Sequence, residues 1–172
     1  MVHTFDPSDD FEPGFFEALG RLVAEFGRLE YIMKVAVKRL RGEKFDEGML
    51  YAEEQLRHLD PLGEEAKKFF CERVDDPSRV AEFERQVNDA VDKWEERNDC
   101  VHCFWTALDD HSPKRYRPKL EGPKKMKKLR WSRGRVVPVQ ELRALADRAA
   151  AVWKFIDAET ERIPHRSPEP KI

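Results

Sequence analysis

Apolar residues recur every three or four positions along residues 15–40, and this spacing constrains the fold more than any other feature of the chain. A stripe with this period lies along one face of an α-helix. We therefore predict a long amphipathic helix near the start of the chain. Its stripe consists of Leu19, Leu22, Val23, Phe26, Leu29, Met33, Val37 and Leu40.

Further helices are predicted over residues 47–59 and 63–74, and again from Pro138 to about Ile163, where the helical period returns. A third long helix follows the break Asp75-Asp76-Pro77-Ser78, in which Asp76 or Ser78 can cap its first free amides. The predicted fold is all-α: a four- to five-helix bundle forming one domain over residues 1–163. A basic loop or β-hairpin is inserted at 107–137, and residues 164–172 form a C-terminal tail.

The chain has 172 residues, which is enough to bury a core without disulfides or metals. Three cysteines and the absence of a leader-like start favour a reducing, cytoplasmic setting. No apolar run approaches the roughly 20 residues that a membrane helix needs, so we expect no membrane association.

Residues 96–105 read ERNDCVHCFW and overlay two motifs, one of cysteines and one of polar residues. On a helical wheel centred on Trp94, Asn98 falls at about +40°, while Arg97 and His102 flank the apolar stripe at about −60° and +80°. Polar side chains beside a seam are costly unless they are paired. These polar side chains are expected to fix helix register as a buried network, to mark a helix end that emerges into solvent, or to form a site. The seam itself is predicted from Val80, Phe83, Val87, Ala90, Val101 and Trp105.

The same wheel places Cys100 and Cys103 at about −120° and 180°, so both thiols are expected to point away from the core. A zinc site would need two more ligands, and a second CxxC pair is missing. A redox CxxC normally opens a helix, whereas this one closes a helix. A metal or redox protein is therefore the third alternative. Its only other ligand candidates are Cys71, His58 and His111.

Arginine and histidine together suit cleavage of RNA without a metal. His102 would move a proton to or from the 2′-hydroxyl or the leaving oxygen, and Arg97 would neutralise charge on the phosphate. Asn98, one turn before His102, could orient the imidazole or the phosphate. Arg97 and His102 are about 140° apart on an ideal helix, so a symmetric dimer is expected to complete the site.

This pattern near the end of a helix resembles the R-x(4 to 6)-H motif of HEPN (higher eukaryotes and prokaryotes nucleotide-binding) domains, with Asn98 at the polar position after the arginine. The opening helix EFGRLEYIMKVAVKRL is also similar to that of small prokaryotic members. The resemblance implies a metal-independent, dimeric endoribonuclease of toxin or phage-defence type, held in check by an antitoxin or regulatory protein. It makes Arg97 and His102 catalytic and Asn98 supporting, with no cofactor. One departure is Cys103, where many relatives have a small residue.

Residues 114–135 hold eleven bases and one acid, whereas the rest of the chain has 21 bases and 33 acids. Such a segment, with interleaved aromatic residues, is typical of RNA binding. It could also be a solvated loop or dock an acidic partner. The alternative to an enzyme is an inactive nucleic-acid-binding or protein-interaction module of the same fold. The predicted RNA-binding residues are Lys114, Arg115, Tyr116, Arg117, Lys119, Lys124, Lys125, Lys127, Lys128, Arg130, Trp131, Arg133 and Arg135.

Overall fold

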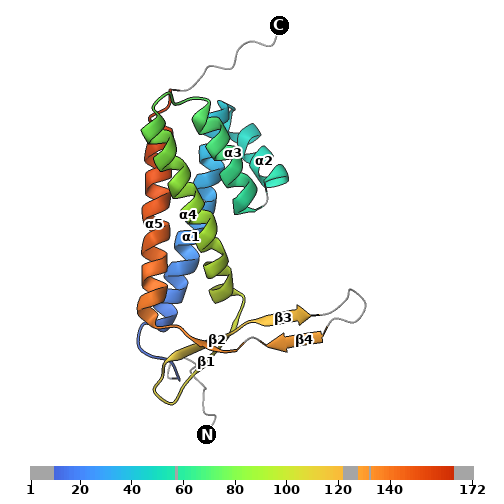
Figure 1. Cartoon of the computed structure of the whole chain (residues 1–172), viewed down its shortest axis with the longest axis vertical. Coiled ribbons are helices and arrows are strands. Elements are labelled where there is room, and N and C mark those ends of the chain that lie inside the picture. Colours follow the sequence, from blue (N-terminus) through green and yellow to red (C-terminus); the bar gives the residue numbers. More distant parts are fainter. Residues whose placement is uncertain (1–9, 57, 122–127, 132, 165–172) are drawn as a thin grey trace. The chain divides into compact units, whose positions relative to one another are not determined.

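The computed structural model describes residues 10–56, 58–121, 128–131 and 133–164; within 118–121 and 128–131 it describes only the backbone. These residues form five helices and five short strands (Figure 1). The mostly helical architecture predicted from the apolar period is confirmed. The elements are α1 (Phe15–Arg41), α2 (Phe45–Gln55), α3 (Leu59–Cys71), α4 (Pro77–Val101), β1 (Phe104–Ala107), β2 (Pro113–Tyr116), β3 (Pro118–Glu121), β4 (Lys128–Trp131), β5 (Arg135–Val136) and α5 (Val139–Glu161).

The first helix begins where the stripe predicts and ends one residue past Leu40. Gly42 follows with a φ of 71°, and its N–H donates to the Arg39 carbonyl at 3.1 Å. Glycine adopts this left-handed backbone without the steric cost that a Cβ would add, so it closes the helix. The last helix starts at Val139, directly after Pro138.

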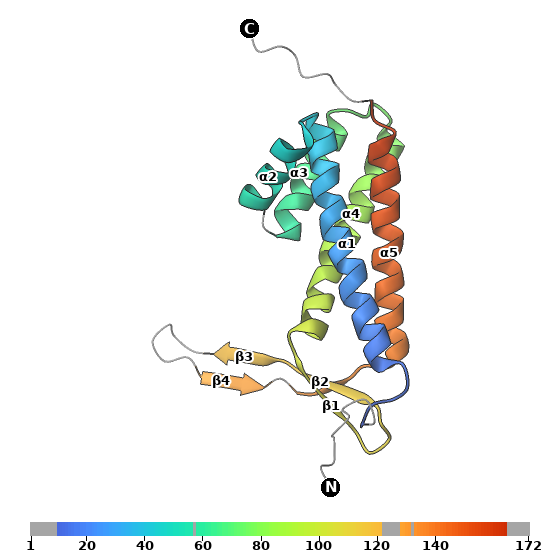
Figure 2. The same cartoon turned by 180° about the vertical axis from the view of Figure 1, so that it is seen from behind.

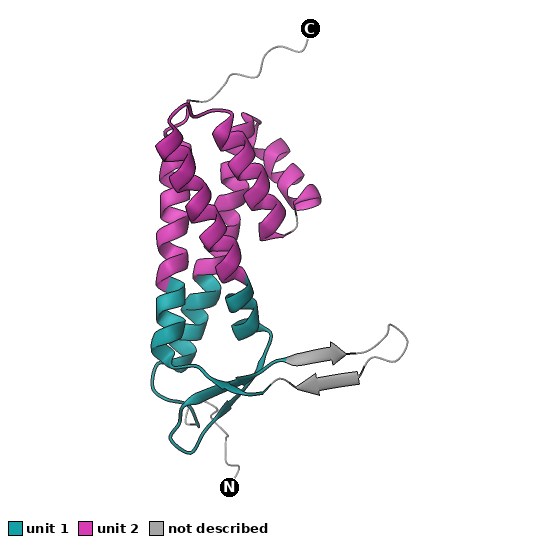
Figure 3. Cartoon of the chain, viewed as in Figure 1, with its two compact units in different colours: residues 1–24, 95–146 teal, residues 25–94, 147–172 magenta. Residues whose placement is uncertain are grey.

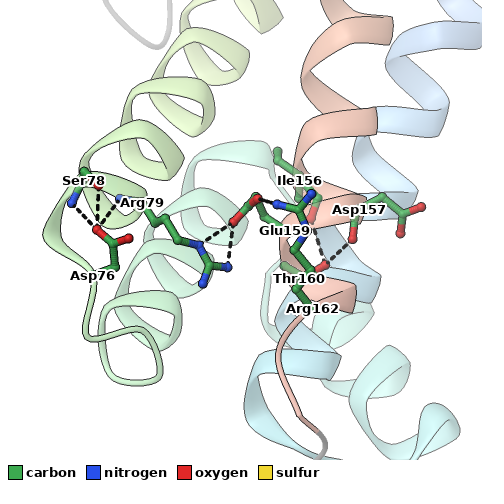
Figure 4. A network of polar contacts seen from close by, with 8 residues as sticks. All are labelled: Asp76, Ser78, Arg79, Ile156, Asp157, Glu159, Thr160 and Arg162. Carbon is green, nitrogen blue, oxygen red and sulfur yellow. Dashed lines mark hydrogen bonds and ion pairs between the residues drawn. The ribbon is translucent and has the colours of Figure 1, made fainter.

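The start of α4 is capped by Asp76, one of the two candidates from the sequence (Figure 4). Its Oδ1 accepts from the Ser78 N–H at 2.9 Å and from the Arg79 N–H at 3.3 Å. The Ser78 hydroxyl also donates to it at 2.6 Å. The hydrogen bond from this hydroxyl and those from the two amides lower the pKa of Asp76, because they favour the charged form.

The chain divides into two compact units (Figure 3). Unit 1 comprises residues 1–24 and 95–146, and unit 2 comprises residues 25–94 and 147–172. Helices α1, α4 and α5 each contribute residues to both units.

Every regular element among the described residues of unit 2 is a helix. Phe70 of α3 stacks on Phe83 of α4 with ring centroids 3.9 Å apart, and both rings are fully buried. Gly63 lets α3 approach α4 closely, since a Cβ there would lie 3.0 Å from Val87. Helix α2 lies beside α3 in both views (Figures 1 and 2), and the Tyr51 hydroxyl donates to Glu65 at 3.2 Å.

Ion pairs tie α5 to α4 within unit 2 (Figure 4). Glu159 of α5 is buried, and it receives the Arg79 guanidinium at 2.8 Å and the Arg162 guanidinium at 2.5 Å. The buried Thr160 hydroxyl donates back to the Ile156 carbonyl at 2.9 Å. A buried carboxylate with two guanidinium partners is compensated for its lost hydration.

Unit 1 contains the ends of three helices and a three-stranded antiparallel sheet in the order β1-β2-β5. Phe15 of α1 is buried and meets Trp105 of β1 edge-on, with centroids 5.0 Å apart. Val137, after β5, and Leu142 of α5 are also buried. The sheet therefore shares a core with the helix ends.

The strands bear on two predictions from the sequence. The β-hairpin expected within the insertion at 107–137 is matched by antiparallel strands, since β3 pairs with β4 and β2 pairs with β5 in a second sheet. Trp105 was expected on the helical seam, but it lies in β1, because α4 ends at Val101. Aromatic and β-branched residues at 104–106 favour a strand, and the wheel had extended the helix through them.

Among the described residues, no helix is both long enough and apolar enough to cross a bilayer.

Candidate functional site at the end of helix α4

The last turn of α4 carries the Arg97-Asn98-x-x-x-His102 motif, as the sequence predicts. The His102 N–H donates to the Asn98 carbonyl at 2.9 Å, so the helical hydrogen bonding continues one residue past Val101, the last residue of α4. Asn98 and His102 therefore stand one turn apart on the same side of the helix. His102 is exposed, whereas Arg97 and Asn98 are half-buried.

Asn98 holds the arginine of the motif. Its Oδ1 accepts from Arg97 Nη1 at 2.9 Å. The sequence suggested that Asn98 orients His102 or a phosphate, but in the structure its side-chain oxygen orients the guanidinium. A fixed guanidinium loses less side-chain freedom when a phosphate binds to it.

The chain turns sharply after His102 and enters β1 two residues later. The Cys100 carbonyl anchors this turn, accepting from Trp105 Nε1 at 2.9 Å and from Cys103 Sγ at 3.2 Å. Carbonyls in the last turn of a helix have no partner within the helix, so these two donors satisfy one of them. The position of His102 is thereby fixed from both sides.

The expectation that both thiols point away from the core is wrong for Cys100, which is 4% exposed, and Cys103 is half-buried. The physical reason is the sheet of unit 1. Arg115 of β2 reaches the Cys100 sulfur with Nη1 at 3.4 Å, so the side of α4 that an isolated helix would show to water faces the sheet instead.

Burial raises the pKa of both thiols, that of Cys103 to about 11. A thiolate is the form that binds metals and attacks disulfides, and at neutral pH both groups remain protonated. Within the described residues no three His, Cys, Asp or Glu side chains gather in a way that could hold a metal ion.

Asp99, inside the motif but unnoticed in the sequence, connects the helix end to the sheet. Its carboxylate pairs with Arg117 and lies 3.7 Å from Arg115, both in the basic segment. The side chain of Arg115 is only 12% exposed, so its charge is partly removed from water and needs this neighbour. The sequence spacing between Asp99 and residues 115–117 does not indicate these ion pairs, because the ion pairs depend on the register of the strands.

The predicted RNA-binding residues fall into three groups. Lys124, Lys125 and Lys127 lie outside the described residues. Of Lys119, Lys128, Arg130 and Trp131, only the strand backbone is described. The structure places the remaining six, Lys114, Arg115, Tyr116, Arg117, Arg133 and Arg135, in or next to β2 and β5 of unit 1.

Several of these cations are neutralised by carboxylates of the same chain. Besides the two arginines at Asp99, Arg135 pairs with Glu141 at 2.6 Å. Lys114 instead sits over the Tyr116 ring, with Nζ 5.3 Å from the centroid, and Arg133 is exposed. The charge count of the segment therefore overstates the positive charge that a polyanion would meet.

Comparison with protein-family models, with curated proteins and with solved structures gave no match to this chain.

Proposed function

We propose that this chain is a metal-independent endoribonuclease of the HEPN type, with Arg97 and His102 as catalytic residues. The observation that supports this most is the exposed imidazole of His102 at the end of α4, one helical turn from the amide that holds Arg97. The motif thereby offers an imidazole that can carry a proton and a guanidinium that is held in place. Both are what attack of a 2′-hydroxyl on its neighbouring phosphate requires.

Arg97 would bind the non-bridging oxygens of the scissile phosphate and stabilise the charge that grows there. The guanidinium fork matches phosphate geometry, and its charge persists at any working pH. Asn98 is a positioning residue, since it acts through Arg97.

The reaction needs both a base for the 2′-hydroxyl and an acid for the leaving 5′-oxygen. One motif supplies a single histidine. A homodimer that packs this end of α4 against its copy would supply two, and two guanidinium groups with them. We therefore propose that the working form is a dimer. Its proposed setting is a toxin or defence system in the cytoplasm, restrained by an antitoxin or regulatory protein.

The second candidate is a module that binds nucleic acid without cutting it. The observation in its favour is that unit 1 carries two further basic residues, Lys114 and Arg133, which take no part in the ion pairs at Asp99 and Glu141. Such binding would weaken steeply with salt, because each phosphate contact releases a counterion.

Cleavage of cellular RNA in EDTA separates these candidates. Wild type should cut, whereas His102→Ala should lose about 10²- to 10⁴-fold in rate, the usual contribution of a positioned proton carrier. Arg97→Ala should lose a comparable factor. Arg133→Ala is the matched control for lost charge, and it should weaken binding without abolishing cleavage. Each variant is first shown to match wild type in circular dichroism and in mass by light scattering.

Two results would reject the enzyme. One is salt-dependent binding by wild type without cleavage of any RNA, which favours the second candidate. The other is cleavage that survives in folded His102→Ala, which would assign the activity to other residues.

A further inference from the structure

The register of the three-stranded sheet in unit 1 sorts its side chains onto two faces. Phe104 pairs with Tyr116, and Thr106 pairs with Lys114, which in turn faces Val136. Directly paired residues share a face of a sheet, and neighbours along a strand alternate. One face therefore carries Phe104, Thr106, Lys114, Tyr116 and Val136, and the other carries Trp105, Ala107, Pro113, Arg115 and Arg135.

The second face is the inner one. Trp105 packs against the buried Phe15, Pro113 is buried, and Arg115 reaches the buried Cys100. The first face is thus the outer face of the sheet, and it begins two residues after His102. Figure 3 shows the sheet within unit 1.

The outer face combines aromatic, aliphatic and cationic side chains. Phe104 is 58% exposed and Val136 is 43% exposed. The Lys114 ammonium lies 5.3 Å from the centre of the Tyr116 ring. None of the five register positions on this face carries a carboxylate.

Gly134 holds the ring of Tyr116 in place on this face. A Cβ at Gly134 would lie 2.4 Å from Lys114 Cε and 2.5 Å from Tyr116 Cε1. The backbone at Gly134 therefore runs against the tyrosine ring and holds it. A ring held by backbone contact loses little freedom when a ligand binds.

Beside Phe104, along β1, there is a cavity of about 560 Å³. Its other walls include Phe11 and Leu108, with the carboxylates of Asp10 and Asp109. Cavities of this size accept small organic groups. Carboxylates of this kind accept hydrogen bonds from amino groups of bases.

We propose that the outer face of the β1-β2-β5 sheet is a base-stacking site for single-stranded RNA, with an unpaired base on Phe104. This inference rests on the proposed function in that RNA is the substrate. An exposed ring on the same sheet face as a cation is a combination that binds unpaired nucleotides, because each base presents a π-face and each phosphate a charge. Duplex RNA fits poorly, since its bases already stack on one another.

The site would also align the chain for cleavage. Two residues of backbone span at most about 7 Å, so a base on Phe104 places its adjoining phosphate near His102. Phe104 is a binding residue in this account, and it takes no part in proton transfer.

The test is binding of a short 2′-O-methyl oligoribonucleotide, which cannot react through its 2′-oxygens, measured by fluorescence anisotropy in EDTA. Phe104→Ala should weaken binding about 5- to 100-fold, the range for loss of one stacked base. Phe104→Trp should bind at least as tightly as wild type. Tyr31→Ala is the matched control, because Tyr31 is a similarly exposed ring (50%) in unit 2, and it should bind as wild type does. The duplex of the same sequence should bind more weakly, with no dependence on Phe104.

Loss of binding in Phe104→Ala that Phe104→Trp does not restore would overturn the stacking site, as would unchanged binding in Phe104→Ala or a preference for duplex. These failures differ from failure of the enzyme. If RNA cleavage depends on His102 while binding ignores Phe104, the proposed function stands and the stacking site does not. If binding depends on Phe104 but wild type cuts no RNA, the stacking site stands and the enzyme does not.

Discussion

At the scale of single residues, the place of the polar trio in the helix was predicted more accurately than the burial of the thiols beside it. Arg97, Asn98 and His102 lie at the helix end where the sequence placed them, because a helical period fixes spacing within one element. The surroundings of Cys100 could not be derived in that way. Its burial depends on Arg115, which comes from a strand 15 residues later.

The thiols give a prediction at this scale. Iodoacetamide at neutral pH should modify the exposed Cys71 first. Cys103 should react more than about 100-fold more slowly than an ordinary thiol, whose pKa is about 8.5. The rate at Cys103 should keep rising with pH up to about 11, because the thiolate is the reactive form. Peptide mass spectrometry measures this. Rapid modification of Cys103 in folded protein at pH 7 would contradict its burial.

At the scale of elements, helices were predicted well and strands poorly. The apolar stripe of α1 and the cap at Asp76 are local signals, and both are confirmed. Strands β1 and β2 have four residues each, and β2 reads Pro-Lys-Arg-Tyr, in which charge hides the alternation of faces. Pairing with β1 and β5 determines its structure, and such contacts between distant residues leave no period in the sequence.

Asp99 offers a prediction about how α4 is joined to β2. Asp99→Asn should lower the free energy of unfolding by about 1–2 kcal/mol, because the partly buried Arg115 keeps its charge and loses its carboxylate. Urea unfolding followed by circular dichroism measures the loss. Glu82→Gln is the matched control: it breaks an exposed ion pair with Arg85 in the same helix and should leave the midpoint unchanged. An equal effect of both substitutions would show that the Asp99 pairs do not anchor the helix end.

At the scale of the whole molecule, basic residues gather in 114–135 and acidic residues predominate in the rest of the chain. Less of that positive charge is available to a ligand than the number of basic residues suggests. Of the arginines that the structure describes in residues 114–135, three pair with Asp99 or Glu141. The sequence shows which segment is basic, whereas the carboxylates that its arginines contact can be identified only from the fold. The motif, the sheet and these cations all belong to unit 1.

The two-histidine reaction predicts a dimer. Light scattering should give twice the 20.3 kDa chain mass at micromolar concentration. A folded monomer with full activity would contradict the composite site, because one chain would then supply both the acid and the base.

The ends of the RNA fragments made in EDTA test the central claim most directly. Proton transfer by His102 to and from RNA oxygens, with Arg97 on the phosphate, predicts 2′,3′-cyclic phosphates, or their hydrolysis products, opposite 5′-hydroxyls. Both should be absent with His102→Ala and with Arg97→Ala. Fragments with 3′-hydroxyls and 5′-phosphates, or cleavage that EDTA abolishes, would contradict the account, because they require an activated water or a metal ion in place of the 2′-hydroxyl.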